Sequence, residues 1–193
     1  SELADKQACA SIGQCELMYI YDKYFSEYNH NVGQVLLTAE DFHAAQRRKN
    51  IVNTIESLIN FGVIPVFNDN VTVSTSEILS IGDNDNLAAQ ISICAEADLL
   101  VLLTDIRGLY TSDPNIDPNA KFISLVEKRD EATLECAGES SSAQGTGGMT
   151  TKLQAARACM DNNIDMVIAK GDQPENLYDL LDGKNIGTLF KGN

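Results

Sequence analysis

The stretch DLLVLLT (98–104) places five consecutive apolar residues between an aspartate and a threonine. A strand with one face in water alternates apolar and polar side chains. This run is apolar throughout, which is typical of a strand buried on both faces of a parallel sheet. We therefore expect residues 98–104 to form the central strand of a parallel sheet.

Further strand-like and helix-like segments alternate on both sides of this strand. The expected strands are GQVLL (33–37), VIPVF (63–67), DMVIA (165–169) and IGTLF (186–190). The expected helices cover residues 3–27, 38–60, 84–96, the segment after GTGG (145–148), and 174–182. Such alternation implies right-handed crossovers and an α/β fold, in which a mainly parallel sheet carries helices on both faces.

The composition restricts the class of partner. The chain has 193 residues and a formal net charge of −14. An acidic surface repels nucleic acid and anionic membranes, so neither is expected as a partner. The five cysteines form no C-x-x-C pair, which indicates reduced cysteines in the cytoplasm that mostly fill the core. The two histidines lack metal-ligand spacing, so no metal site built from protein ligands is expected.

Polar clusters follow three of the expected strands. NDN (68–70) comes after VIPVF, TD (104–105) ends the central strand, and KGDQPEN (170–176) comes after DMVIA. Ligands of parallel sheets bind in the loops that leave the carboxyl ends of the strands. We expect the functional site at that edge of the sheet.

The segment GDNDN (82–86) begins one of the expected helices. Asp and Asn at a helix start satisfy free backbone N–H groups and suit its positive end, so helix capping is one interpretation. Four such residues exceed what a cap needs, and the pattern does not match a calcium loop. The other interpretation is catalytic: Asp85 orients cationic groups, and Asn84 binds an amino-acid substrate.

The segment GTGGMTTK (145–152) is rich in glycine and threonine and ends in a lysine. It is not a Walker loop, in which the lysine directly follows the last glycine. Its backbone N–H groups and the positive helix end can still bind phosphate. A lysine in a first helical turn opposes the helix dipole, and binding of an anion explains Lys152 directly. The alternative is a flexible loop before a helix, with Lys152 as a surface residue.

Together, GDNDNLAA (82–89), LLTDIRGLYTSDP (102–114) and GTGGMTTKLQAA (145–156) resemble the amino acid kinase superfamily and, within it, the glutamate 5-kinase family. Further resemblance lies in KQACASIGQ (6–14) and VIPVFNDN (63–70). The likeness covers nearly the whole chain. It implies a three-layer α/β/α sandwich, the amino acid kinase fold, formed by residues 1–193 as a single domain.

The resemblance also implies a reaction, in which ATP phosphorylates the γ-carboxylate of L-glutamate in the first step of proline biosynthesis. Lys152 would stabilise the transferring phosphoryl group, and Asp85 would orient the lysines. The implied ATP contacts are Thr104, Asp105, Thr146, Gly147, Gly148, Met149, Thr150, Thr151 and Lys152. The implied glutamate contacts are Asn68, Asn70, Asp83 and Asn84. Mg²⁺ would accompany ATP, the protein would form homodimers or homotetramers, and proline would be a feedback inhibitor.

The chain departs from the family pattern in two places. The family's amino-terminal strand with its K-x-G-S motif is not in these residues, so we expect an amino-terminal segment outside them. The sequence also ends after GTLF (187–190), without the RNA-binding-like domain that some members carry. Where the family reads N-x-N-D, this chain reads Asn68-Asp69-Asn70-Val71, so that either Val71 replaces the aspartate or residues of a loop are missing there. Two alternatives therefore stay open: a related kinase for another small carboxylate or phosphate, and a non-catalytic amino-acid or nucleotide sensor.

Overall fold

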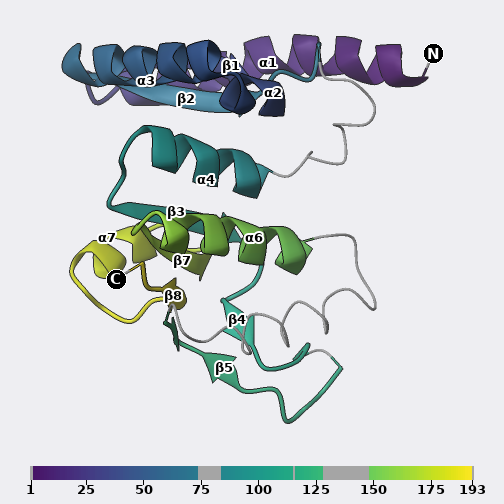
Figure 1. Cartoon of the computed structure of the whole chain (residues 1–193), viewed down its shortest axis with the longest axis vertical. Helices are drawn as coiled ribbons and strands as arrows, with labels where there is room; N and C mark the ends of the chain where they lie inside the picture. The colour runs from purple at the N-terminus through teal and green to yellow at the C-terminus, as the bar shows by residue number, and fades with distance from the viewer. Residues whose placement is uncertain (1, 74–83, 115, 128–147, 193) are drawn as a thin grey trace. The chain divides into compact units, whose positions relative to one another are not determined.

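The computed structural model describes residues 2–73, 84–114, 116–127 and 148–192 (Figure 1). The chain divides into two compact units, Ser1–Leu87 and Ala88–Asn193, and the boundary falls inside helix α4 (Asn84–Cys94). Each unit contains its own sheet and its own covering helices.

The first unit is built around two parallel strands. Its elements are α1 (Glu2–Ser26), β1 (Asn31–Leu37), α2 (Ala39–His43), α3 (Ala45–Asn60) and β2 (Val63–Asp69). The strands pair in register from Asn31 opposite Val63 to Leu37 opposite Asp69. The expected helix at 3–27 and the expected strands at 33–37 and 63–67 are therefore confirmed, with one or two more residues at some of their ends.

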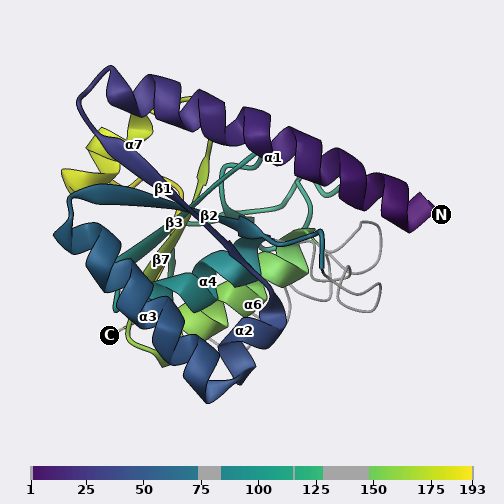
Figure 2. The same cartoon turned by 90° about the horizontal axis from the view of Figure 1, so that it is seen from above.

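Helices α1 and α3 lie on opposite faces of the β1–β2 pair. A side chain at Gly33 would meet Leu58 of α3, while the next residue, Gln34, bonds to Gln14 of α1. Successive side chains of a strand point to opposite faces, so the two helices sandwich the strands. Figure 2 shows β1 and β2 between α1 and α3. This unit thus has the three layers that an α/β/α sandwich requires.

The expected single helix at 38–60 is wrong in one detail, because it is broken at Ala44. Ala44 has extended backbone (φ −83°, ψ 113°), which ends α2 and begins α3. Thr38 caps α2 as its position predicted: its backbone N–H and its hydroxyl donate to one oxygen of Asp41, over 2.7 and 2.9 Å. Arg47 of α3 donates to the other carboxylate oxygen over 2.8 Å, so Asp41 holds the two helices together.

The second unit contains a four-stranded sheet and a short hairpin. Its elements after α4 are β3 (Leu99–Thr104), β4 (Leu109–Tyr110), β5 (Phe122–Ile123), β6 (Leu125–Val126), α6 (Gly148–Asp161), β7 (Asp165–Lys170), α7 (Asn176–Leu181) and β8 (Thr188–Phe190). The strand order is β3-β7-β8-β6, and β4 pairs with β5. The β3–β7 and β6–β8 pairs are parallel, and β7–β8 is antiparallel.

The strand at 98–104 was expected at the centre of the sheet, but within this unit β7 takes the more buried position. β3 stands at one end of the strand order, and Leu103 is 45% exposed. β7 has a partner on each side, and four of its six residues are buried. An apolar run indicates burial, but it does not say which of two such runs lies further inside.

The apolar core of this unit lies between the sheet and helices α4 and α6. It includes fully buried side chains from α6, β7 and β8, among them Ala156, Cys159, Met166 and Phe190. Burial raises the pKa of the Cys159 thiol to about 11, so it stays protonated and unreactive. Cys94 is buried as expected of a core filler. Cys9 and Cys15 are exposed on α1, so that expectation is wrong for both of them.

A short left-handed turn joins α6 to β7. Asn163 has φ +60°; its N–H donates to the carbonyl oxygen of Met160, and the N–H of Ile164 donates to that of Cys159. This is a common way for a helix to end, because it satisfies the last carbonyl groups. The turn reverses the chain at once, so α6 packs antiparallel to β7. Its amino end therefore lies at the edge where β3 and β7 end.

Gly187 allows the chain to enter β8 close to the backbone of β7. It has φ +70°, and a Cβ there would overlap the carbonyl oxygen of Ile168. Gly183, with φ +81°, has a similar backbone but open space around it. Both glycines therefore adopt a left-handed backbone, but only Gly187 lies against another part of the chain.

We predict that Gly187→Ala lowers the free energy of unfolding by about 3 kcal/mol, because it adds a steric overlap to the cost of a left-handed backbone. Gly183→Ala carries the backbone cost alone and is expected to lose about 1 kcal/mol. Urea denaturation followed by circular dichroism measures both. Equal losses in the two variants would contradict the steric contact with Ile168.

The Asp41 cap predicts a dependence of stability on pH. Burial tends to raise the pKa of Asp41, but hydrogen bonds from Thr38 and Arg47 outweigh it and lower the pKa below the ordinary value of 3.8. Its contribution is therefore fully present well above pH 3.8 and is lost as the pH falls through the lowered pKa. At pH 7 we expect Asp41→Asn to lose about 1 kcal/mol.

Urea titrations at pH 7 and pH 3 measure this difference. Glu40→Gln is the matched control, because it removes a neighbouring carboxylate while Asp41 keeps its bonds to Thr38 and Arg47. A difference between wild type and Asp41→Asn that is as large at pH 3 as at pH 7 would show that the charge of Asp41 does not stabilise the cap.

Candidate active site

Lys152 lies in the first turn of α6, as the sequence predicted. Its Nζ donates to the carbonyl oxygen of Gly148 over 3.3 Å, and the hydroxyl of Thr151 donates to the same oxygen over 3.1 Å. The first four residues of the helix, GMTT, include no acidic side chain. The positive end of the helix and the lysine therefore add to one another, which favours an anion at this place.

The residues just before Lys152 differ in what they can offer a ligand. Met149 packs its side chain against the apolar core, so only its backbone is available to a ligand. Thr150 and Thr151 are half-buried on the first turn. Thr146 and Gly147, which were predicted to contact ATP, lie outside the described residues.

Thr104 ends β3, and Asp105 begins the loop that follows it. The hydroxyl of Thr104 donates to the carboxylate of Asp105 over 3.0 Å, and its carbonyl oxygen accepts from the N–H of Gly171 over 2.8 Å. Lys170 is the partner of Thr104 in the β3–β7 register. Its Nζ lies 2.6 Å from Asp172, and this hydrogen bond raises the pKa of Lys170.

The loop after Asp105 is held by Thr188 of β8. The hydroxyl of Thr188 accepts from the N–H of Leu109 over 2.7 Å and donates to the carbonyl oxygen of Ile123 over 2.6 Å. Gly108 lies against this hydroxyl, where a Cβ would come within 2.5 Å of it. Sequence reasoning did not single out Thr188, because its partners are 65 and 79 residues away.

The predicted ATP contacts that the structure describes therefore lie at one edge of this unit's sheet. Thr104 and Asp105 leave the carboxyl end of β3, and the antiparallel packing of α6 on β7 brings Gly148 to Lys152 to the same edge. The edge combines backbone N–H groups, a lysine and a hydroxyl. Such a set suits a polyphosphate.

In the first unit, four carboxamides form a hydrogen-bonded series. Asn84 donates to Oδ1 of Asn68 over 3.3 Å, and Asn68 donates to Oε1 of Gln14 over 3.0 Å. Gln14 in turn donates to Oε1 of Gln34 over 3.0 Å. The structure thus brings together Asn68 and Asn84, both predicted to bind the acceptor. Sequence reasoning did not assign Gln14 and Gln34 to the site.

Asn70 and Val71 lie in the turn after β2. The N–H of Asn70 donates to the carbonyl oxygen of Leu37 over 2.7 Å, and its Oδ1 accepts from the hydroxyl of Thr72 over 2.6 Å. The side chain of Asn70 therefore stabilises this turn. Val71 follows directly and is half-buried, so this turn carries an apolar side chain at that position.

Asp85 is half-buried in the first turn of α4. It belongs to the first unit and Lys152 to the second, so the orientation of Lys152 by Asp85 stays a prediction. Asp83, predicted to contact the acceptor, lies outside the described residues.

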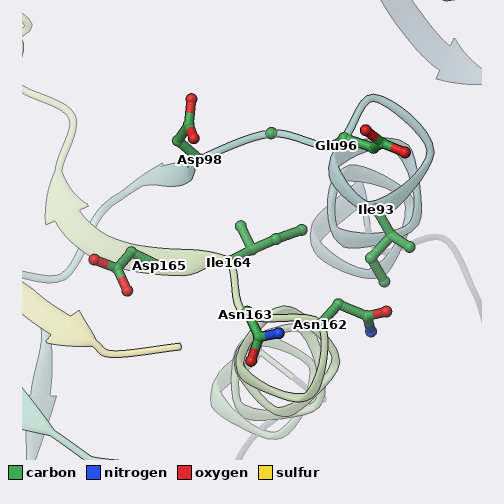
Figure 3. A pocket seen from close by; sticks show the side chains of 8 residues that line it. Ile93, Glu96, Asp98, Asn162, Asn163, Ile164 and Asp165 are labelled. Carbon is green, nitrogen blue, oxygen red and sulfur yellow. The ribbon is translucent and has the colours of Figure 1, made fainter. Parts of the chain in front are cut away.

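A cavity of about 590 Å³ opens at the opposite edge of the second sheet (Figure 3). Its lining residues are Ile93, Glu96, Ala97, Asp98, Asn162, Asn163, Ile164 and Asp165. They lie where α4 and α6 end and where β3 and β7 begin. Three carboxylates and two negative helix ends make this cavity unfavourable for a nucleotide. It is therefore separate from the predicted site.

Within the described ranges, no three His, Cys, Asp or Glu side chains are grouped so that they could hold a metal ion. In the same part of the chain, no helix combines the length and apolar character needed to cross a bilayer.

The chain is similar in sequence to known members of the amino acid kinase family. The sequence model of the amino acid kinase family matches residues 1–170. The chain is 46% identical over 191 residues to glutamate 5-kinase of Clostridium perfringens, covering 97% of this chain and 71% of that protein. It is 48% identical over 188 residues to glutamate 5-kinase of Carboxydothermus hydrogenoformans, covering 97% of this chain and 50% of that protein.

Two solved structures share the fold at low sequence identity. UMP kinase from Bacillus anthracis matches with a TM-score of 0.62 at 16% identity, over 98% of this chain and 70% of that one. Isopentenyl phosphate kinase from T. acidophilum matches with a TM-score of 0.57 at 18% identity, over 92% and 66%. At these identities the likeness describes the fold alone.

Proposed function

The chain belongs to the amino acid kinase family and, within it, to the glutamate 5-kinases, and we propose that it transfers the γ-phosphoryl group of ATP to the γ-carboxylate of L-glutamate. The observation that carries the proposal is the start of α6, where Lys152 and an acid-free first turn share a sheet edge with Thr104 and Asp105. The products would be ADP and glutamyl 5-phosphate, which begins proline biosynthesis.

The proposed reaction is an in-line phosphoryl transfer. An oxygen of the acceptor carboxylate bonds to the γ-phosphorus as the bond to the leaving oxygen of ADP breaks. Protein catalysis of such a step consists mainly of positioning and of positive charge on the transferring group. Lys152 and the first N–H groups of α6 would supply that charge. Asp85 would orient Lys152. Mg²⁺ would arrive on the ATP phosphates and help neutralise them, which suits the part of the chain that the structure describes, where no carboxylate cage is present.

The acceptor would bind at the carboxamides of Asn68 and Asn84. An amide group offers both a donor and an acceptor, so it can meet a carboxylate and an ammonium group of one amino acid. Asp83 and Asn70 are proposed as further contacts. For Asn70 we expect a backbone contact, because its side chain binds Thr72.

Several finer properties belong to the same proposal. We propose that the two units together form one amino acid kinase domain, since the family match at residues 1–170 spans both. We also propose a homodimer or homotetramer in the cytoplasm, with proline as a feedback inhibitor and with no nucleic-acid or membrane partner. The high negative charge of the chain supports the exclusion of nucleic acid and of membranes as partners.

The first prediction from this proposal concerns the acceptor. With Mg-ATP, the full-length protein is expected to form ADP in the presence of glutamate and to leave aspartate and N-acetylglutamate unused. A coupled assay of ADP measures all three. Val71 is the observation that favours the second candidate, a kinase for another small carboxylate or phosphate. Activity with a different acceptor and none with glutamate would establish that candidate.

The second prediction concerns Lys152. We expect Lys152→Ala to lower turnover by about 10²- to 10³-fold, because one positive contact on developing charge contributes about 2.7–4 kcal/mol. Affinity for ATP is expected to change by less than about threefold. Steady-state kinetics gives the first value, and calorimetric titration with ATP gives the second.

The matched control for this experiment is Lys184→Ala. Lys184 is an exposed lysine of the same unit, paired with Asp179 over 2.6 Å, and it lies outside the proposed site. Its turnover is expected to equal that of the wild type. If Lys152→Ala behaved like this control, Lys152 would be a surface residue.

A further inference from the structure

We infer that Gln14 of α1 is a positioning residue for the acceptor, because it holds the nitrogen end of the Asn68 carboxamide, whose oxygen end is held by the backbone. The inference rests on the proposed function, in which Asn68 and Asn84 bind the amino acid. Gln14 is not among the residues assigned to the site by the sequence, and it acts through Asn68.

The orientation of Asn68 follows from one backbone group. The N–H of Asp69 donates to Oδ1 of Asn68 over 3.0 Å. A backbone N–H can only donate, so the oxygen of the Asn68 amide must face it and the nitrogen must face the other way. That nitrogen lies 3.0 Å from Gln14, which must therefore present its own oxygen.

The same reasoning continues along the series. Because Oε1 of Gln14 accepts from Asn68, its Nε2 is the atom that meets Gln34, over 3.0 Å. Gln34 must in turn offer its oxygen. One backbone group thus determines the direction of three side-chain hydrogen bonds, including the bond from Asn84 to Oδ1 of Asn68.

The series leaves hydrogen-bonding capacity for a ligand. An amide nitrogen carries two hydrogens, and the bond to Gln14 uses one of those on Asn68. The bond to Asn68 likewise uses one of the two on Asn84. The remaining N–H groups suit a carboxylate, and the amide oxygen of Asn84 suits an ammonium group. Without Gln14, the N–H of Asp69 still bonds to the oxygen of the Asn68 amide, but the nitrogen loses its bond to Gln14 and is less firmly positioned for a ligand.

The packing of α1 on the strands does not by itself explain why position 14 is a glutamine. The half-buried residues of α1 follow the spacing of one helix face: Leu3, Gln7, Ala10, Gln14, Met18 and Phe25. An apolar side chain at this position would pack without needing partners. A half-buried amide is unfavourable unless it is bonded, and Gln14 bonds to side chains of strands β1 and β2.

The test is Gln14→Met, which preserves the length of the side chain and removes its acceptor. We expect the KM for glutamate to rise about five- to tenfold, the typical effect of one hydrogen bond. The KM for ATP is expected to stay within about twofold. The matched control is Gln46→Met, which removes an exposed amide–amide bond to Asn50 on α3, away from the series.

A double variant separates positioning from general loosening of the helix. If Gln14 acts through Asn68, then Gln14→Met should not raise the KM for glutamate any further in an Asn68→Ala background. A further rise in that background would overturn the inference. So would an unchanged KM for glutamate in Gln14→Met, when the wild type is active.

Two other outcomes are also decisive. A wild-type protein without glutamate-dependent turnover would overturn the proposed function, and the inference would fall with it. Should Gln14→Met fail to fold, Gln34→Met carries the test, because it removes only the outer bond of the series from an exposed strand position. We expect it to raise the KM for glutamate about twofold to threefold, and no change would overturn the inference.

Discussion

The three-residue connection from α6 to β7 is the constraint on which the arrangement of the second unit depends. Because Asn163 adopts a left-handed backbone, the helix ends and the strand begins almost at once. The six-residue strand β7 then runs back along the 14-residue helix α6. The two elements have nearly equal lengths of about 20 Å. The positive end of the helix therefore arrives at the carboxyl edge of the sheet.

This reversal gives the two edges of the sheet opposite character. At the carboxyl edge lie a helix start without acidic residues, Lys152, and the end of β3 at Thr104. At the amino edge lie two helix ends and the carboxylates that line the cavity of Figure 3. A polyphosphate is favoured at the first edge and repelled at the second. The direction of the helices alone thus favours binding of a polyphosphate at the carboxyl edge of the sheet.

The first unit shows a different principle, in which a polar network depends on one backbone donor. Carboxamides are nearly symmetric in shape, so a side chain by itself does not determine which atom a ligand meets. The N–H of Asp69 removes that ambiguity for Asn68, and the hydrogen bonds pass it on to Gln14 and Gln34. The same three layers that bury the strands bring α1 close enough to supply Gln14 (Figure 2).

Much of the fold could be predicted from the sequence because the signals are local. The apolar runs of β2, β3 and β7, the Thr38 cap and the helix that begins near Gly148 are all readable from neighbouring residues. The break at Ala44 and the antiparallel direction of β8 were not predicted. Both depend on distant groups: Arg47 reaches back to Asp41 across the break, and β8 packs on β7 through Gly187.

The sequence by itself determined the α/β class and the membership in the amino acid kinase family, and it predicted Lys152, Thr104 and Asn68 as site residues. Those features rest on periodicity and on motifs whose residues lie side by side in the chain. Only the tertiary structure decided that Gln14 meets Asn68, 54 residues away, and that Thr188 holds the loop after Asp105. A single amide or hydroxyl has no periodic signal, and it acquires a role only when folding brings its partner within hydrogen-bonding distance.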